Sequence, residues 1–173
     1  MASVSLVRVD DRLIHGQVVV KWLRYVGADA IWIVDDQLSA DAFLQSILRL
    51  AAPPGVQVEV AAANEAPRLL AKASEQGHHV LLLVKSPQTA LALFEQGLDF
   101  GELNVGGLGA APNTTRVYKS VSLSPTHMAS LRCLQERGVR VYFQMVPEER
   151  SVDLSEVLPS HGLHRALAAT KRE

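Results

Sequence analysis

The sequence has 173 residues, of which 48% are hydrophobic and 20% are charged, and its net charge at pH 7 is -1. This length and composition fit one globular domain with its own core. The lack of a basic excess argues against a nucleic-acid partner, and the apolar runs are far shorter than a membrane-spanning helix. One cysteine, Cys133, excludes an internal disulfide. Four charged residues among the first 15 lead us to expect no signal peptide.

The first predicted strand covers residues 4–10, where valine and leucine predominate. A polar turn, Asp10-Asp11-Arg12, follows the strand, and the chain then passes through His15 and Gly16 into a predicted helix over 16–27. Apolar residues in that helix lie three, four and seven positions apart, which is the spacing of one helix face. His15 is therefore expected between the carboxyl end of the first strand and the N-terminus of the first helix.

This position suits His15 for phosphate chemistry. A helix N-terminus presents unpaired backbone N–H groups and the positive end of the helix dipole. Arg8 and Arg12 lie within seven residues of His15, and these groups together favour a phosphate that is bound beside the imidazole or bonded to it. In a purely structural alternative, His15 forms loop hydrogen bonds and the arginines pair with Asp10 and Asp11.

Strand and helix patterns alternate along the rest of the chain. We predict further strands over 30–34, 56–60, 80–84, 103–105, 116–123 and 139–145. Helices are expected to begin near Ser39, Asn64, Ser86 and Ser124, which are suitable N-caps, and a short helix is expected over 152–158. This alternation predicts a doubly wound, mainly parallel α/β sheet in one domain over residues 1–160. The tail over 161–173 lacks a strong core pattern and is expected to be partly disordered.

A family resemblance extends this interpretation. The stretch Arg8-Val9-Asp10-Asp11-Arg12-Leu13-Ile14-His15-Gly16-Gln17-Val18-Val19 resembles the active-site loop of enzyme IIB of the mannose/fructose/sorbose family of the bacterial phosphotransferase system (PTS). Later segments resemble that family in the same order: Val34-Asp35-Asp36, Ala51-Ala52-Pro53-Pro54-Gly55-Val56, Leu83-Val84-Lys85-Ser86-Pro87, Leu103-Asn104-Val105-Gly106-Gly107 and Met145-Val146-Pro147. The resemblance covers residues 3–158.

The resemblance implies a single-domain, doubly wound, mainly parallel seven-stranded sheet with helices on both faces. With strands numbered along the chain, the implied order is 3-2-1-4-7-5-6, and strand six is antiparallel. Strands two and four would then flank strand one. The loop that carries His15 and the loop that carries Lys85 and Ser86 would meet in one crevice, at the edge where open α/β sheets bind ligands.

The resemblance also implies a phosphocarrier enzyme, a protein-phosphohistidine–sugar phosphotransferase. His15 would accept a phosphoryl group from a phosphohistidine of the IIA component and pass it to a sugar held by the membrane components IIC and IID. The protein would be cytoplasmic and would reach the membrane only through IIC and IID, without inserting itself. A neutral imidazole is a competent nucleophile, and a reference pKa of about 6.5 leaves most of it neutral at cytosolic pH.

A phosphorylated His15 carries negative charge that other groups must offset. We expect Arg12, together with Arg8 or Lys85, to supply positive charge. Asp10 is expected to orient the loop or to hold Arg12, because a carboxylate repels a phosphoryl group. The other predicted phosphate-binding residues are Gly16, Gln17, Val18 and Ser86. No metal and no organic cofactor is required. The family carries the phosphate on Nδ1, but this sequence does not show which ring nitrogen is used.

Other motifs receive structural interpretations. Gly106-Gly107-Leu108-Gly109 is neither G-x-G-x-x-G nor a P-loop, so we interpret it as a turn after the fifth strand. Asp35 and Asp36 are expected to cap or to bond within their loop. The pairs His78-His79 and His161/His164 have no Cys or carboxylate set at ligand spacing, which argues against a metal.

Two other classes of function stay open at this point. One is a non-catalytic module that binds phosphate or another anion and regulates a partner, with His15 acting only as a hydrogen-bond donor. The other is a hydrolase with a phosphohistidine intermediate, which needs a second acid or base that we cannot assign. Gain of an acid-labile, base-stable phosphate would distinguish a phosphocarrier from the binding module.

Overall fold

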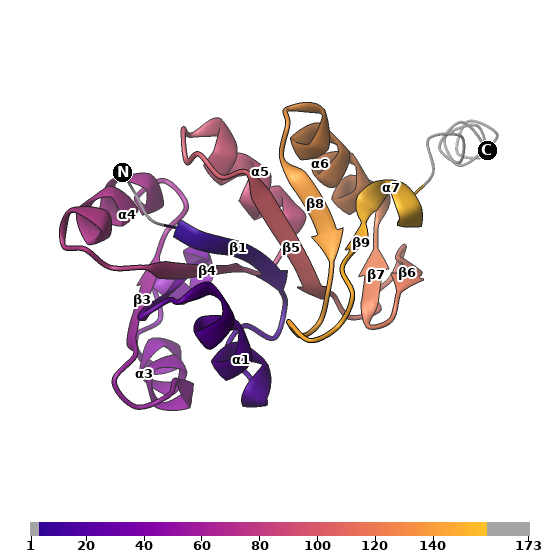
Figure 1. Cartoon of the computed structure of the whole chain (residues 1–173). Helices are drawn as coiled ribbons and strands as arrows, with labels where there is room; N and C mark the ends of the chain where they lie inside the picture. Colours follow the sequence, from indigo (N-terminus) through magenta and orange to yellow (C-terminus); the bar gives the residue numbers. More distant parts are fainter. Residues whose placement is uncertain (1–3, 159–173) are drawn as a thin grey trace.

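A mainly parallel sheet forms the centre of the computed structural model, which describes residues 4–158 (Figure 1). Seven strands pair in the order β3-β2-β4-β1-β5-β8-β9. Their bounds are β1 (Val4–Asp10), β2 (Ala30–Val34), β3 (Gln57–Ala61), β4 (Val80–Val84), β5 (Glu102–Gly107), β8 (Arg140–Phe143) and β9 (Val152–Asp153). All pairs are parallel except β8 with β9, so six strands place their carboxyl ends along one edge.

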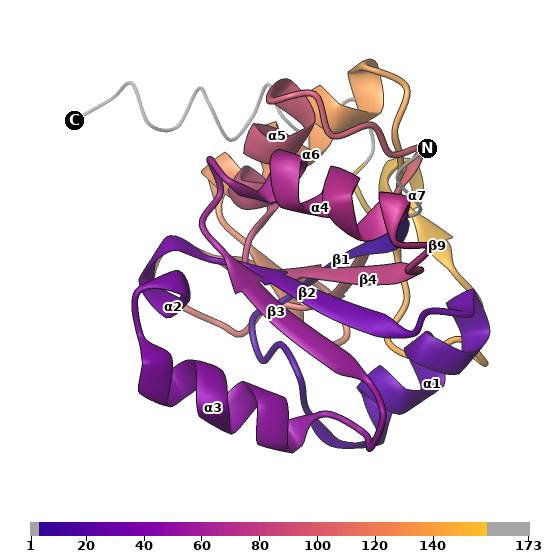
Figure 2. The same cartoon turned by 90° about the vertical axis from the view of Figure 1, so that its left-hand side faces the viewer.

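Helices cover both faces of the sheet, as Figure 2 shows. On one face lie α1 (Gly16–Val26) and α3 (Ala42–Ala51), and on the other lie α4 (Ala66–Glu75), α5 (Pro87–Glu95) and α6 (Pro125–Glu136). The side chains of strand β4 are buried alternately on the two faces of the sheet. Leu81 and Leu83 belong to the hydrophobic cluster on the α1 side, while Val80, Leu82 and Val84 belong to the cluster on the other face. A strand that is covered on both faces reads as a continuous apolar run.

The predicted fold class is confirmed, but the predicted strand order is wrong. Residues 80–84 (β4) lie between β2 and β1, whereas we expected strand one to lie between strands two and four. The far side of β1 pairs with β5, and β8 follows β5 rather than β4. The two central strands β2 and β4 are both apolar and fully buried, so their composition does not specify which of them is next to β1.

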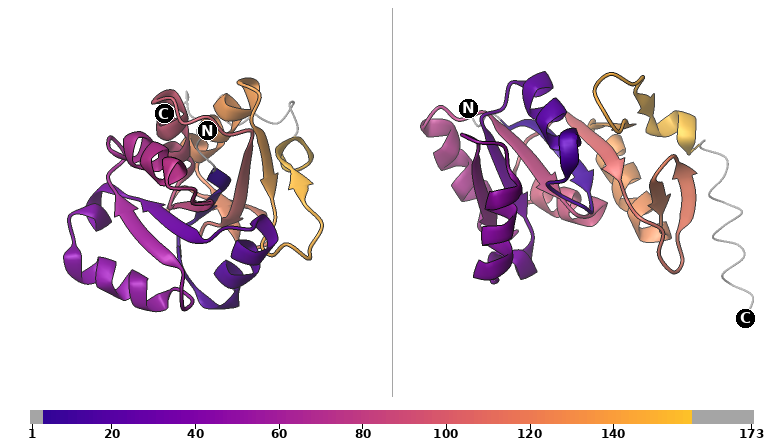
Figure 3. Two further views of the ribbon diagram at one scale, coloured as in Figure 1. Left: turned by 60° about the vertical axis from the view of Figure 1, so that its left-hand side comes forward. Right: turned by 90° about the horizontal axis from the view of Figure 1, so that it is seen from below.

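The predicted antiparallel sixth strand is also corrected. Residues 116–123 were expected as one edge strand, but a turn at Lys119-Ser120 divides them into β6 (Thr115–Tyr118) and β7 (Val121–Leu123). These two strands form a separate antiparallel hairpin near the β8–β9 end of the sheet (Figure 3). Lys119 takes a positive φ of 30° there, a conformation typical of tight turns rather than of strands.

The antiparallel edge strand is β9, inside the segment 152–158 that we predicted as helix. Only the short helix α7 (Leu154–Val157) forms there, after Asp153. The backbone N–H of Asp153 donates to Glu156 Oε1 at 3.2 Å, an N-terminal capping contact that fixes the helix start. Val152 and Asp153, which precede this helix, therefore pair with β8.

Two of the four predicted helix N-caps are confirmed. Ser86 and Ser124 cap α5 and α6 as predicted. The helix expected from Ser39 is instead two helices, α2 (Asp36–Ser39) capped by Asp35 and α3 capped by Asp41. Glu65 rather than Asn64 is the N-cap residue of α4. The predicted tail over 161–173 lies outside the described residues. Across residues 4–158, no helix combines the length and apolarity needed to span a membrane.

Candidate functional site

The loop after β1 holds His15 in a fixed position. Leu13 N donates to Asp10 O at 3.0 Å, which closes a turn directly after the strand. Leu13 and Ile14 bury their side chains in the cluster under α1, although Leu13 must take a positive φ of 57°. A non-glycine residue in this region is strained, and packing around it keeps it there. His15 follows as the extended N-cap residue of α1.

Asp10 connects Arg8, Arg12 and His15. Its Oδ2 lies 3.0 Å from His15 Nε2 and accepts from Arg8 Nη2 at 2.9 Å. Its Oδ1 accepts from the backbone N of Arg12 at 3.2 Å and from Arg12 Nε at 3.3 Å. The Asp10 side chain is fully buried, and its position at the end of β1 places it under the loop. Asp10 therefore holds Arg12, one of the roles that we expected for it, and it also contacts His15.

The charge state of Asp10 decides which nitrogen of His15 is available. Burial alone would raise the pKa of Asp10, but the charge of Arg8 and the hydrogen bond from His15 outweigh it and hold that pKa below its usual value. An ionised carboxylate accepts hydrogen bonds and cannot donate them, so Nε2 of His15 carries the proton in this contact. The lone pair of the neutral ring then lies on Nδ1.

Arg8 is not at the surface; it lies beneath Asp10. Its side chain is 3% exposed. It donates to Asn104 Oδ1, to Gln144 O at 3.1 Å and to Met145 O at 3.3 Å, and its guanidinium lies 5.2 Å from the Trp22 ring centre. Burial lowers the pKa of Arg8, and the charge of Asp10 opposes that effect. Of the two roles we weighed for Arg8, the structure shows pairing with an aspartate.

Arg12 is the arginine that reaches the surface beside His15. Its side chain is 48% exposed, and only Nε is engaged with Asp10. The backbone N–H groups of Gly16, Gln17 and Val18 occupy the first turn of α1, where they have no acceptor within the helix. No side chain caps this helix start. An anion at His15 would therefore meet helix N–H groups and the free edge of the Arg12 guanidinium.

Lys85 and Ser86 have other partners. Lys85 Nζ pairs with Asp35 Oδ2 at 3.3 Å, and Ser86 Oγ caps α5 through Thr89 N at 3.3 Å. The loop after β4 leads to the α5 face, whereas the loop after β1 leads to the α1 face. These two residues are thus not brought into the hydrogen-bonded cluster around Asp10, and their role as phosphate ligands stays a prediction.

Several site residues were not recognised from the sequence. Asn104, Gln144 and Trp22 surround Arg8, and Gly106 and Gly107 leave room for the cluster. A Cβ at Gly106 would overlap the Arg8 guanidinium, and one at Gly107 would lie 3.0 Å from Asp10 Oδ1. These glycines end strand β5 rather than forming the turn we expected. The polar Asn104 between two apolar residues of a buried strand was the available signal.

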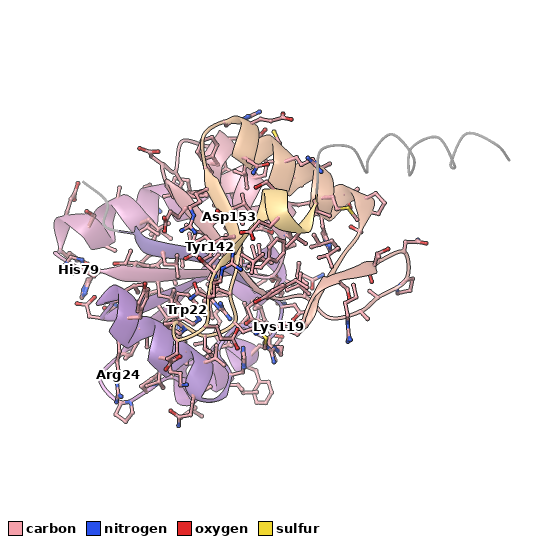
Figure 4. The ribbon with its side chains drawn as sticks, turned by 45° about the vertical axis from the view of Figure 1, so that its right-hand side comes forward. Trp22, Arg24, His79, Lys119, Tyr142 and Asp153 are labelled. Atoms are coloured by element: carbon pink, nitrogen blue, oxygen red, sulfur yellow. The ribbon has the colours of Figure 1, made fainter. Side chains whose placement is uncertain are left out.

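The remaining candidates have structural roles. Asp35 caps α2, and Asp36 accepts from Ala63 N at 2.8 Å, as predicted. His78 pairs with Asp29, and His79 lies at the left-hand edge of the molecule in Figure 4. In the described part of the chain, no group of three or more His, Cys, Asp or Glu side chains could hold a metal. His161 and His164 lie outside the described residues.

Known proteins are similar to this chain in sequence and in fold. Residues 4–168 match the family model for the PTS system sorbose subfamily IIB component. The sorbose-specific EIIB component of Klebsiella pneumoniae is 34% identical over 152 residues, which span 88% of this chain and 93% of that protein. The fructose-specific EIIB component of Bacillus subtilis (strain 168) is 27% identical over 158 residues, which span 91% of this chain and 97% of that protein. The crystal structure of manxB from Thermoanaerobacter tengcongensis superposes with a TM-score of 0.83 at 35% identity, covering 91% of this chain and 95% of that one.

Proposed function

This chain belongs to the PTS IIB components of the mannose/fructose/sorbose family, and from that membership we propose that His15 is its phosphoryl carrier. His15 accepts a phosphoryl group from a phosphohistidine of a IIA component and delivers it to a sugar bound by membrane components IIC and IID. The protein works in the cytoplasm and meets the membrane through those two partners.

The transfer exchanges one P–N bond for another. The Nδ1 lone pair of His15 attacks the phosphorus, the bond from phosphorus to the donor imidazole breaks, and the donor ring leaves with its electron pair. In the second half, a sugar hydroxyl attacks the phosphorus on His15 and its proton passes to water. The bond from phosphorus to Nδ1 breaks, and the imidazole of His15 leaves with the electron pair. Such a transition state needs positioning and charge stabilisation more than covalent chemistry from the protein.

The surrounding residues divide this work. Asp10 accepts a hydrogen bond from Nε2–H of His15 and so presents Nδ1 as the nucleophile. Arg8 offsets the Asp10 charge from beneath, so that the carboxylate does not repel an incoming phosphoryl group. Arg12 and the N–H groups at the start of α1 offset the charge of the phosphorylated ring. No step in this scheme needs a metal or an organic cofactor.

The contact between Asp10 and His15 Nε2 supports this function best. In an anion-binding module, His15 would donate an N–H to the anion, but Nε2–H already donates to the ionised Asp10, which leaves Nδ1 as an acceptor. A hydrolase would need a free base to activate water. Both oxygens of Asp10 are hydrogen bonded within the cluster, so Asp10 is not available for that task.

Transfer of labelled phosphate from a phosphorylated IIA protein tests the proposal. We expect the wild-type chain to gain a phosphate that is stable in base and labile in acid, and to lose it when sugar and membranes containing IIC and IID are added. Release of inorganic phosphate from the isolated protein at a comparable rate would instead indicate a hydrolase. No incorporation, with retention of a non-covalent phosphate site, would indicate the regulatory module.

A further inference from the structure

Asn104 is a buried polar residue that is linked to the His15 site through Arg8, which donates hydrogen bonds to both Asn104 and Asp10. It lies on β5 between Leu103 and Val105 and is completely buried. Its Oδ1 accepts from Arg8 Nη1, and its Nδ2 donates to Gln144 O at 3.2 Å. The orientation of this amide is chemically determined, because a guanidinium has only donors and a carbonyl only accepts. A buried amide is costly unless it is hydrogen bonded in this way.

The partners of Arg8 allow its guanidinium one orientation. Nη1 faces Asn104 and Gln144 O, while Nη2 faces Asp10 Oδ2 and Met145 O. Asn104 and Asp10 are thus the side-chain acceptors at the two ends of the group, and the others are backbone carbonyls. An acceptor at the Nη1 end keeps the Nη2 end directed at Asp10.

The orientation of the Arg8 guanidinium determines how well the negative charge of Asp10 is compensated. Asp10 faces Arg8 from β1, Arg12 from the loop and His15 from the start of α1. Arg8 also faces Tyr142 on β8, and burial raises the pKa of Tyr142 to about 12, so that phenol is neutral near pH 7. Arg8 is therefore the buried cation that compensates Asp10. A less compensated Asp10 would stabilise a protonated His15 ring, which has no lone pair for attack.

We propose that Asn104 is a positioning residue for phosphoryl transfer: it fixes the Arg8 guanidinium so that Arg8 compensates Asp10 and His15 stays neutral and nucleophilic. This inference rests on the proposed function of His15, but it concerns the protonation of His15, which can be measured without any phosphoryl donor.

The most direct variant is Asn104→Asp, which keeps the side-chain shape and adds a second carboxylate next to Arg8. Arg8 is then shared between two carboxylates, and Asp10 is less compensated. We expect the titration midpoint of the His15 ring, followed by NMR in the unphosphorylated protein, to rise by about one pH unit relative to wild type. Phosphoryl acceptance should fall about fivefold near pH 6.5 and largely recover near pH 8.5, since deprotonation restores the nucleophile.

A second variant covers the case in which the added carboxylate prevents folding. Asn104→Leu buries no new charge and removes only the acceptor from Arg8, so the His15 midpoint should rise in the same direction by a smaller amount. Ser130→Ala is the matched control, because Ser130 is also buried and bonded, through Thr126 O at 3.0 Å, but lies on α6. The control should leave the His15 midpoint unchanged even where it lowers stability.

The outcomes separate the two proposals. His15 midpoints within about 0.2 pH unit of wild type in both Asn104 variants would overturn the role of Asn104, whatever happens to phosphorylation. A uniform loss of acceptance at every pH, without a shifted midpoint, would show a merely structural role and overturn it as well. A wild-type protein that takes no phosphate would refute the proposed function, while a shifted midpoint would still support the coupling of Asn104 to His15.

Discussion

Replacement of Gly106 by alanine tests how tightly the buried cluster is packed. A methyl group at this position would overlap Cζ, Nη1 and Nη2 of Arg8. The end of an arginine side chain can usually move aside, but this one is buried and bound by Asn104, Asp10 and two backbone carbonyls. Relief of the overlap must therefore break some of these hydrogen bonds or shift β5.

The expected cost follows from these two routes. Overpacking a core by one methyl group typically costs about 1–3 kcal/mol. If Arg8 moves instead, the fully buried Asp10 loses its cation, and breaking a buried ion pair costs about 3–5 kcal/mol. We expect Gly106→Ala to lower the free energy of unfolding by about 3 kcal/mol, or to lower the melting temperature by roughly 6–12 °C for a domain of this size.

Denaturant unfolding followed by circular dichroism measures this loss, and Gly101→Ala is the matched control. Gly101 precedes the same strand and needs no positive φ, and a methyl group there would meet no heavy atom within 4 Å. The control should unfold at the wild-type denaturant concentration or slightly above it. Equal midpoints for Gly106→Ala and Gly101→Ala would refute the view that Arg8 is rigidly held.

Three further predictions concern charge. Arg12→Ala should slow phosphoryl acceptance about 10²–10³-fold, as loss of one preorganised donor does elsewhere, while the exposed Arg68→Ala on α4 should leave the rate unchanged; equal losses would remove the specific role of Arg12. The pKa of Asp10 is held below its usual value in the folded protein, so its stabilisation is complete above about pH 5 and disappears as the pH falls through that lowered pKa. Asp10→Asn should therefore flatten the acid limb of stability against pH, and an unchanged limb in urea titrations would contradict this. Transfer from IIA should slow as salt rises, through association at the exposed Arg12; a rate constant that is the same at about 50 mM and about 500 mM salt would exclude electrostatic docking there.

The sequence was sufficient where the signal is local. Apolar runs placed most of the strands, serines placed the starts of α5 and α6, and the polar turn after the first strand placed His15 between β1 and α1. Each of these features depends on residues a few positions apart, and hydrophobic periodicity or a helix-capping residue can therefore reveal it.

Long-range contacts were not predictable in this way. Arg8 alternates with valines and so could have faced solvent, a phosphate or an aspartate. Its burial depends on Asn104 and Gln144, which are 96 and 136 positions further along the chain. The order of β2, β4 and β1 was not predictable for a similar reason. The composition of apolar strands that are buried on both faces does not show which strands pair with them.

In the proposed transfer, Asp10 holds Nε2 of His15 and leaves Nδ1 to carry the phosphate. The most direct test is phosphorus and nitrogen NMR of the protein labelled with ¹⁵N in histidine, after phosphorylation by a IIA protein. We expect one phosphohistidine, at His15, with phosphorus bonded to Nδ1 and a proton on Nε2, and no such signal in His15→Ala. Phosphate on Nε2, or on the His15→Ala protein, would contradict it.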